Sequence, residues 1–477
     1  MIGKIKKIQS LPIMERILRF FNSPLFIFIY GAGVLACSFL GFEILFFSLT
    51  SIIVIFTAIF SKDSKPLLVP LVLVIYSMSQ KHTPQHPYSS NYLYRPYVLI
   101  SIGVMAVFVL ASLIFRLVVY KSEKSILKSK PVAFWGIVAL CISLILNGIF
   151  YIKYTIFNLL LALILSFSFI FFYVYFFKTL NFNKEIGKYI AIVFSVACAI
   201  ISLQILETLI FDGVIKNGTI DKHVLNLGWG MSNNAGAMLA IFMPSAFYLF
   251  NKIENKVLSR LFYLYGFIIV GVIALTLSRT SLLVAGLALL VIMIIASFKG
   301  KDLLFTRIFN IAVIVCALIL FFVFFDKFIE LFNHYIDKGF DDSERLFIWK
   351  NGFINFAKAP IFGVGFYTPI APDWSYNIEN WFFPDMYHNT FIQLLASCGI
   401  VGVLAYCFHL FQCGRLLFKK INVERLFYLF VTLILTITCL FDNHIFHVFP
   451  ALIYSSLFAV AEKDYAEVVG NFKEDVK

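Results

Sequence analysis

Residues 155–177 read TIFNLLLALILSFSFIFFYVYFF, a run of mostly apolar and aromatic side chains without a single charge. A helix of about 20 such residues is long enough to span the hydrocarbon core of a bilayer. Similar runs recur along the whole chain of 477 residues, of which 61% are hydrophobic and 14% are charged. Soluble domains are about half apolar and roughly a quarter charged. The composition therefore excludes a water-soluble protein and predicts an all-α polytopic membrane protein.

Fourteen apolar runs can be placed along the chain, and four of them are short or crowded, so we expect about 12–14 transmembrane helices. The runs are 25–41, 43–60, 66–79, 98–115, 132–150, 155–177, 189–211, 232–250, 261–277, 280–298, 308–325, 387–411, 426–441 and 445–461. The pattern predicts four parts: N-terminal transmembrane helices (1–190), central transmembrane helices (191–325), a large extracytoplasmic loop (326–386), and C-terminal transmembrane helices with a cytoplasmic tail (387–477).

The basic residues indicate how the chain crosses the membrane. Lys and Arg favour cytoplasmic loops, and with the N-terminus inside, 28 of the 39 basic residues fall in cytoplasmic segments. We therefore expect both termini in the cytoplasm. The formal net charge of +13 follows from these anchors, which face the anionic inner leaflet. Membrane lipid is thus an expected partner, and nucleic acid is not.

The longest polar stretch, 326–386, falls on the outer side and carries nine acids against five bases. Apolar residues repeat at helical spacing between Phe347 and Phe356, ahead of Pro360. This pattern predicts an amphipathic helix over about 342–358 at the outer membrane–water boundary. An aromatic stretch follows, suited either to the interfacial belt or to stacking on sugar rings. Its members are Trp374, Tyr376, Trp381, Phe382 and Phe383.

The sequence contains no pattern typical of a cofactor or metal site. All eight cysteines lie within or beside apolar runs and form no C-x-x-C pair, which argues against a disulfide framework or a zinc site. No glycine-rich nucleotide loop, H-E-x-x-H or G-x-S-x-G pattern occurs. We therefore expect no cofactor, no metal and no nucleotide.

Arg279 stands in Leu277-Ser278-Arg279-Thr280-Ser281, between two apolar runs with no loop to hold it. It lies on the outer side, against the charge bias. An arginine near the membrane is costly unless it snorkels to the interface or meets an anion. Two interpretations remain: a snorkelling side chain at a helix turn, or a binding group for an anion.

Arg345 lies just before the apolar face of the expected loop helix, four residues before Trp349. Beside Glu344 it is consistent with a surface ion pair of little energetic weight. Together with Arg279 on the same side of the membrane, it is also suited to clamping a diphosphate, because guanidinium groups match phosphate oxygens in a bidentate way.

His388 and Asn389 lie where the outer loop re-enters the membrane. Imidazole is suited to proton exchange near neutral pH, although a histidine at the interface often only forms a hydrogen bond. Asn389 is suited either to orienting a ligand or to capping the helix. Two other residues give weaker signals: Asn234 near the start of an apolar run, and Asp442, which either orients a histidine or belongs to a short polar turn.

The order of these motifs resembles the O-antigen ligase family of bacterial polysaccharide enzymes, which includes O-antigen ligases, O-antigen and capsule polymerases and protein O-oligosaccharyltransferases. The resemblance covers roughly residues 225–450. The motifs that carry it are Asn234-Ala235-Gly236 with Pro244, Leu277-Ser278-Arg279-Thr280, Arg345-x-x-x-Trp349, Pro360-x-x-Gly363-x-Gly365, His388-Asn389-x-Phe391-Ile392 and Gly399-Ile400-x-Gly402.

The resemblance implies a membrane glycosyltransferase of the GT-C type in the bacterial cytoplasmic (inner) membrane, with its active site facing the periplasm. Its donor would be an undecaprenyl-diphosphate-linked glycan, and its acceptor a glycan or lipid A–core. His388 would be the general base, and Arg279 and Arg345 would bind the diphosphate. Asn389, Asn234, Trp349 and Asp442 would be supporting residues. Other polysaccharide-assembly proteins are further expected partners.

Two subtypes and one rival remain at this point. A ligase transfers the glycan to lipid A–core, whereas a polymerase transfers it to another lipid-linked repeat, and the long aromatic outer loop slightly favours the polymerase. The rival is a transporter or flippase for polysaccharide or lipid-linked oligosaccharide. Such proteins place ionisable groups near the bilayer midplane, whereas here the polar residues gather at one face.

Overall fold

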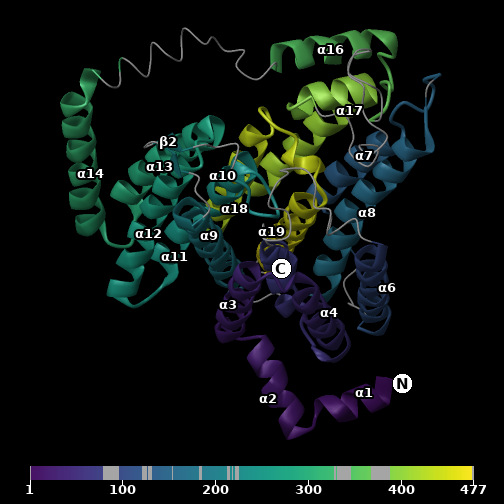
Figure 1. Ribbon diagram of the computed structural model, residues 1–477. Helices are drawn as coiled ribbons and strands as arrows, with labels where there is room; N and C mark the ends of the chain where they lie inside the picture. The colour runs from purple at the N-terminus through teal and green to yellow at the C-terminus, as the bar shows by residue number, and fades with distance from the viewer. Residues whose placement is uncertain are drawn as a thin grey trace.

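The structure is a computed structural model of the chain. It describes residues 2–78, 96–120, 126, 131–152, 154–181, 185–211, 215–216, 219–220, 225–326, 329, 345–366 and 387–474. Nearly all of these residues are helical (Figure 1). The described strands are two residues long each, β1 (Ile215–Lys216) and β2 (Thr219–Ile220), and pair antiparallel. The expected all-α polytopic fold is confirmed.

The helices up to the hairpin are α1 (Ile2–Gln9), α2 (Pro12–Phe21), α3 (Pro24–Leu40), α4 (Glu43–Phe60), η1 (Lys65–Leu67), α5 (Leu68–Leu73), η2 (Val74–Ser77), α6 (Pro96–Val119), α7 (Ala133–Ile145), α8 (Ile156–Thr179) and α9 (Ile186–Phe211). Those after it are α10 (Ser232–Phe242), α11 (Pro244–Lys252), α12 (Lys256–Leu275), α13 (Arg279–Lys299), α14 (Leu303–Val323), α16 (Arg345–Lys358), α17 (Thr390–Leu417), α18 (Val423–Thr438), η6 (His444–Phe446) and α19 (Val448–Glu474).

Each of the fourteen apolar runs coincides with one, two or, at 66–79, three helical elements, but not all are full-length spans. Within the described residues, eight helices are long and apolar enough to cross a membrane, or nine if α2 and α3 count as one bent span. Others are short or divided for identifiable reasons. Pro244 separates α10 from α11, since proline lacks the N–H that would continue the first helix. The run at Lys65–Ser77 contains Pro66 and Pro70 and alternates between 3₁₀ and α geometry.

The hydrophobic core lies around α9, which is the most deeply buried of the spans, with 72% of its apolar window inside the protein. It packs against α3, α10 and α11, while α8 packs on α19 and α7 on α17. One continuous cluster of buried side chains extends from Phe26 to Ala461. The periphery is formed by α6 and α14, whose apolar windows are only 17% and 11% buried, as expected for helices that face lipid.

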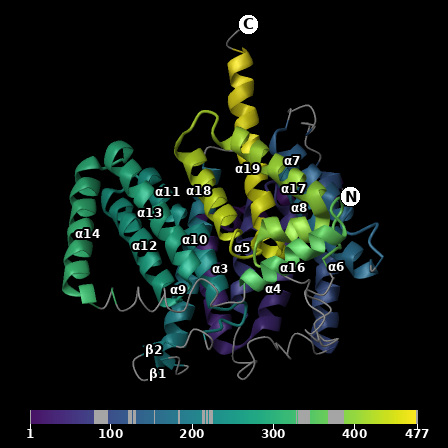
Figure 2. The ribbon, with the colours of Figure 1, turned by 90° about the horizontal axis from the view of Figure 1, so that it is seen from above.

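The two ends of the helix bundle differ in what they carry. The β1–β2 hairpin lies at one end and the C-terminal part of α19 projects from the other (Figure 2). Because consecutive spans run antiparallel, the connections 276–278, 387–389 and 439–447 lie at the same end as the hairpin. This end is called the hairpin end below, and every candidate site residue lies at it.

The helix expected over about 342–358 is present as α16 and ends just before Pro360. Its buried residues Ile348 and Gly352 pack against Tyr387 and Ile392 at the start of α17. The expected aromatic stretch from Trp374 to Phe383 lies outside the described residues.

Candidate functional site

His388 and Asp442 form the centre of the site. His388 immediately precedes the N-cap of α17, and Asp442 lies in the turn after α18. His388 Nδ1 is 3.3 Å from Asp442 Oδ1. Because a carboxylate only accepts hydrogen bonds, the proton in this contact belongs to Nδ1, which leaves Nε2 of the neutral ring as an acceptor. The His388 side chain is 41% exposed and that of Asp442 is 18% exposed, so the imidazole is accessible while its partner is largely covered.

The electrostatics of this turn favour an ionised Asp442 and neutral neighbouring histidines. Burial by itself raises the pKa of Asp442, but the hydrogen bond with His388, and the attraction to His444 and His388 whenever these rings are protonated, outweigh it and hold the pKa well below its usual range. Burial lowers the pKa of His444, and it lowers the pKa of His447 to about 4. Asp442 is therefore a fixed negative charge beside the His388 ring.

The backbone holds His388 in an unusual conformation. Its φ is +49°, in the left-handed region that non-glycine residues rarely adopt. Hydrogen bonds on both sides fix this geometry: Tyr387 N–H donates to Gln393 Oε1 at 3.1 Å, and Thr390 N–H donates to Cys439 O at 2.8 Å. Backbone strain of this kind is retained where surrounding contacts over-determine it, and it often occurs at functional sites.

Asn389 caps α17 and joins it to the turn after α18. Its Oδ1 accepts hydrogen bonds from the N–H groups of Phe391 and Ile392, at 2.9 and 3.1 Å. Its Nδ2 donates to Leu440 O at 2.8 Å. The capping interpretation of Asn389 thus describes its contacts, and the residue also fixes His388 relative to the turn that carries Asp442.

α16 supports the segment in front of His388. Trp349 Nε1 donates to Tyr387 O at 3.0 Å, and Asn355 Nδ2 donates to the Tyr387 hydroxyl at 2.8 Å. Gln393 Oε1 also accepts a hydrogen bond from Asn443 Nδ2 at 2.8 Å. Four residues of this network were not predicted from the sequence as site residues: Tyr387, Asn355, Gln393 and Asn443. An available signal was the spacing of Gln393 and Ser397, two polar residues four apart in an apolar helix, whose side chains hydrogen-bond at 2.9 Å.

A break in α17 locks α16 to this region. Gly399 has φ 65° and ψ −159° inside the helix, a conformation open essentially to glycine alone. The backbone groups freed there bond to the segment after α16. The carbonyls of Ala396 and Ser397 accept from the N–H groups of Val364 and Gly365, at 2.8 and 3.0 Å. Ile400 N–H donates to Pro360 O at 2.9 Å.

Glycine is required on both sides of this contact. A Cβ on Gly363, where φ is +70°, would clash with the backbone of Ser397, and a Cβ on Gly399 would clash with that of Ile361. The two glycine motifs found in the sequence therefore interlock, a relation that their spacing alone did not predict.

Arg279 is the first residue of α13 and is exposed. The turn before it is tight: Leu277 has φ +53°, and the hydroxyls of Ser278 and Ser281 are 2.8 Å apart. Gly236 of α10 packs directly on this turn, since an added Cβ would lie 3.0 Å from Ser281 Oγ. Asn234, two residues earlier and half-buried, lies in the first turn of α10, the helix that supports the Arg279 turn.

The predicted residues thus form three groups at the hairpin end: the cluster around His388, Arg345 at the start of α16, and the Arg279 turn with Asn234. His388, Asn389, Asp442 and Trp349 belong to one hydrogen-bonded cluster. Arg345 is half-buried one helical turn before Trp349. Among the described residues, the hydrogen bonds of the His388 side chain do not extend to Arg279 or Arg345, and no group of three or more His, Cys, Asp or Glu residues is arranged to hold a metal ion.

Residues 264–407 match the family model described as O-antigen ligase. The chain therefore contains an O-antigen ligase family domain. The resemblance expected from the motifs is confirmed over this range, which is narrower than the predicted 225–450. No curated protein gave a match.

The O-antigen ligase domain extends from α12 into α17 and contains Arg279, Arg345 and His388. Asn234 and Asp442 lie outside it, yet Asp442 contacts His388 and the α10 helix carrying Asn234 supports the Arg279 turn. Helices on both sides of the domain therefore complete the site. The protein is a multi-pass membrane protein in which residues 264–407 are similar to O-antigen ligases.

Proposed function

We propose that the protein transfers a glycan from undecaprenyl diphosphate to an acceptor hydroxyl at the outer face of the bacterial cytoplasmic membrane. The observation that carries the proposal is the His388–Asp442 pair, because its Nδ1 contact leaves Nε2 available as a base. In this proposal the hairpin end faces outward, and both termini lie in the cytoplasm.

The reaction needs one proton acceptor and one site for a leaving anion. The acceptor hydroxyl attacks the anomeric carbon of the donor sugar, and its proton passes to Nε2 of His388. The bond between that carbon and the diphosphate oxygen breaks, and the diphosphate keeps the electron pair. A positioned base contributes about 10²–10⁴-fold to such a step.

Arg279 and Arg345 have the role of offsetting the charge of the diphosphate. Fixed positive charge aimed at a developing anion lowers the barrier without needing an acid to protonate the leaving group. Both arginines lie at the same end of the bundle as His388, each at the first position of a helix. Asp442 stabilises the imidazolium that forms when His388 takes the proton. No metal or nucleotide is invoked.

The test is transfer by the purified protein in lipid nanodiscs, with a defined undecaprenyl-diphosphate-linked repeat as donor. Two acceptors are compared, a second lipid-linked repeat and lipid A–core, each with and without EDTA. We expect transfer that persists in EDTA, and the acceptor used distinguishes polymerase from ligase. Absence of transfer to either acceptor by folded protein, or its loss in EDTA with recovery on adding metal, would contradict the proposal.

A further inference from the structure

α14 contacts the rest of the bundle along only half of its length. Its buried residues are Thr306 and Asn310, both in the first half. Asn310 Nδ2 donates to Met293 O and Ser297 Oγ of α13, at 3.1 and 2.9 Å. Beyond Asn310, every residue as far as Asp326 is exposed except Val313, which is half-buried. The second half of α14 is therefore exposed on all sides, including the side that continues the contact with α13.

The facing side of α13 is open in the same way. Met293 and Ser297 contact α14, and steps of three or four residues along that side lead to Leu290, Gly286, Leu282 and finally Arg279. Leu290 and Leu282 are 53% and 39% exposed, and a Cβ on Gly286 would meet no atom within 4 Å. The two helices thus separate above Met293 and Asn310.

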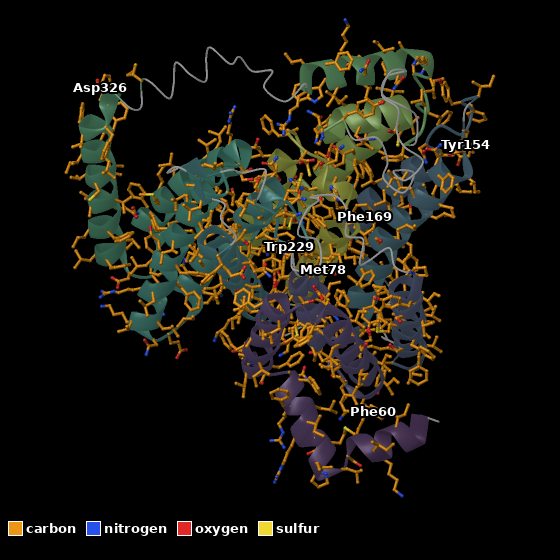
Figure 3. The ribbon with its side chains drawn as sticks, in the orientation of Figure 1. Phe60, Met78, Tyr154, Phe169, Trp229 and Asp326 are labelled. Carbon is orange, nitrogen blue, oxygen red and sulfur yellow. The ribbon has the colours of Figure 1, made fainter. Side chains whose placement is uncertain are left out.

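The resulting feature, called the α13–α14 crevice, opens toward the hairpin end. α14 stands away from α13 at this end in both views, and Asp326 just beyond it lies far from the other helices (Figures 1, 2 and 3). From Asn310 to Val323 the open length is roughly 20 Å at 1.5 Å per residue. This is about two thirds of the hydrocarbon thickness of a bilayer. The crevice is closed at its base, where residues 300–302 join the two helices.

The walls and the end of the crevice differ in chemistry. The walls are formed by leucine, isoleucine, valine and phenylalanine side chains, and Arg279 lies at the hairpin end of the α13 wall. A ligand suited to this arrangement has a long apolar chain and an anionic head. A second helix fits less well, because helices pack with axes 8–10 Å apart and this crevice narrows to its base. A flexible hydrocarbon chain can instead fill the α13–α14 crevice along its whole length, because it adapts to the changing distance between the two helices.

We propose that the α13–α14 crevice holds the polyprenyl tail of the donor and admits it from the bilayer, so that its diphosphate arrives at Arg279. This inference rests on the proposed function and adds to it the place of the lipid tail. Phospholipids share the combination of apolar chain and phosphate, so the experiment must separate the two lipids.

The experiment is photolabelling of the full-length protein in phospholipid nanodiscs by a polyprenyl diphosphate that carries a diazirine in its tail. Labelled peptides are identified by mass spectrometry. Gly286→Trp fills the crevice without a clash, because the space beside Gly286 is open. Gly103→Trp is the matched control, since a Cβ on Gly103 of the peripheral α6 also meets no atom within 4 Å.

We expect labelling in 279–299 and 303–323, reduced at least tenfold by Gly286→Trp and unchanged by Gly103→Trp. Unlabelled polyprenyl diphosphate should compete, and excess phospholipid should not. Labelling elsewhere, equal labelling of both variants, competition by phospholipid, or crosslinks from α14 to another protein chain would overturn the inference. Because labelling needs no turnover, labelled crevice peptides without glycan transfer would contradict the proposed function and leave this inference standing.

Discussion

At the residue scale, Asp442 determines what His388 can do. The 3.3 Å contact fixes the ring so that Nε2 is the free nitrogen, and the low pKa of Asp442 keeps the carboxylate ionised at any physiological pH. Asp442→Asn keeps the shape but removes the charge. We expect kcat for glycan transfer to fall on the order of 10²-fold, with little change in KM for the donor, because neither substrate contacts Asp442 in this account. A changed KM with normal kcat would assign Asp442 to substrate binding instead.

The buried histidines of the same turn predict how stability depends on pH. His447 has a pKa of about 4 in the folded protein because it is buried, whereas an unfolded histidine titrates near 6.5. Between these pH values the unfolded chain binds a proton that the folded chain does not, so stability falls as the pH drops from about 6.5 to 4. The slope for one such group is at most about 1.4 kcal/mol per pH unit.

Thermal melting of the detergent-purified protein between pH 7.5 and 4.5 measures this slope. His447→Gln should flatten it. An equally steep decline in the variant would show that His447 does not cause the acid sensitivity.

At the element scale, the break in α17 is the main device that positions the site. Gly399→Ala places a Cβ against the Ile361 backbone at a positive φ, so the hydrogen bonds between the α17 break and residues 360–365 cannot all be kept. We expect a loss of about 2 kcal/mol or more, measured as a lower Tm, together with reduced transfer. Gly271→Ala, toward the C-terminal end of α12, is the control, because its Cβ meets no atom within 4 Å and alanine favours a helix. Equal melting temperatures for the two variants would contradict this role of Gly399.

Sequence patterns predicted the elements better than their connections. The apolar runs and the amphipathic spacing before Pro360 located the helices, because burial in lipid or against α17 repeats with the helical period. The interlocking of Gly363 and Gly399 was not predictable, since it depends on which backbone groups meet in three dimensions. Nor did the run lengths show that Pro244 and the prolines of 66–70 divide their spans, because hydropathy does not register a missing N–H.

For the site, the motifs identified His388, Asn389 and Trp349, which the fold brings together. Asp442 gave only a weak signal, since a carboxylate in a short turn is common, and its partner lies 54 positions earlier in the chain. Tyr387 and Asn443 were missed because single buried polar residues have no spacing signature, whereas the four-residue spacing of Gln393 and Ser397 was a signal for part of this cluster. The part of the aromatic loop beyond Phe366 lies outside the described residues and stays a prediction.

At the scale of the whole molecule, glycan transfer at the outer face of the membrane requires the hairpin end to face outward. In a cysteine-free background, Ile152→Cys, 93% exposed in the turn between α7 and α8, should react with a membrane-impermeant maleimide added from outside. Glu254→Cys, exposed between α11 and α12 at the opposite end, should react only after the membrane is opened. The reverse pattern would place the site in the cytoplasm and rule out an outward-facing transferase.

In the proposed reaction His388 is the base in glycan transfer, held by Asp442 and aided by the two arginines. The most direct measurement is the rate of transfer by purified His388→Ala, compared with wild type at equal protein concentration and with matched melting temperature. We predict a rate about 10²–10⁴-fold lower, with binding of the lipid-linked donor retained. A folded His388→Ala protein that transfers glycan at the wild-type rate would contradict the account.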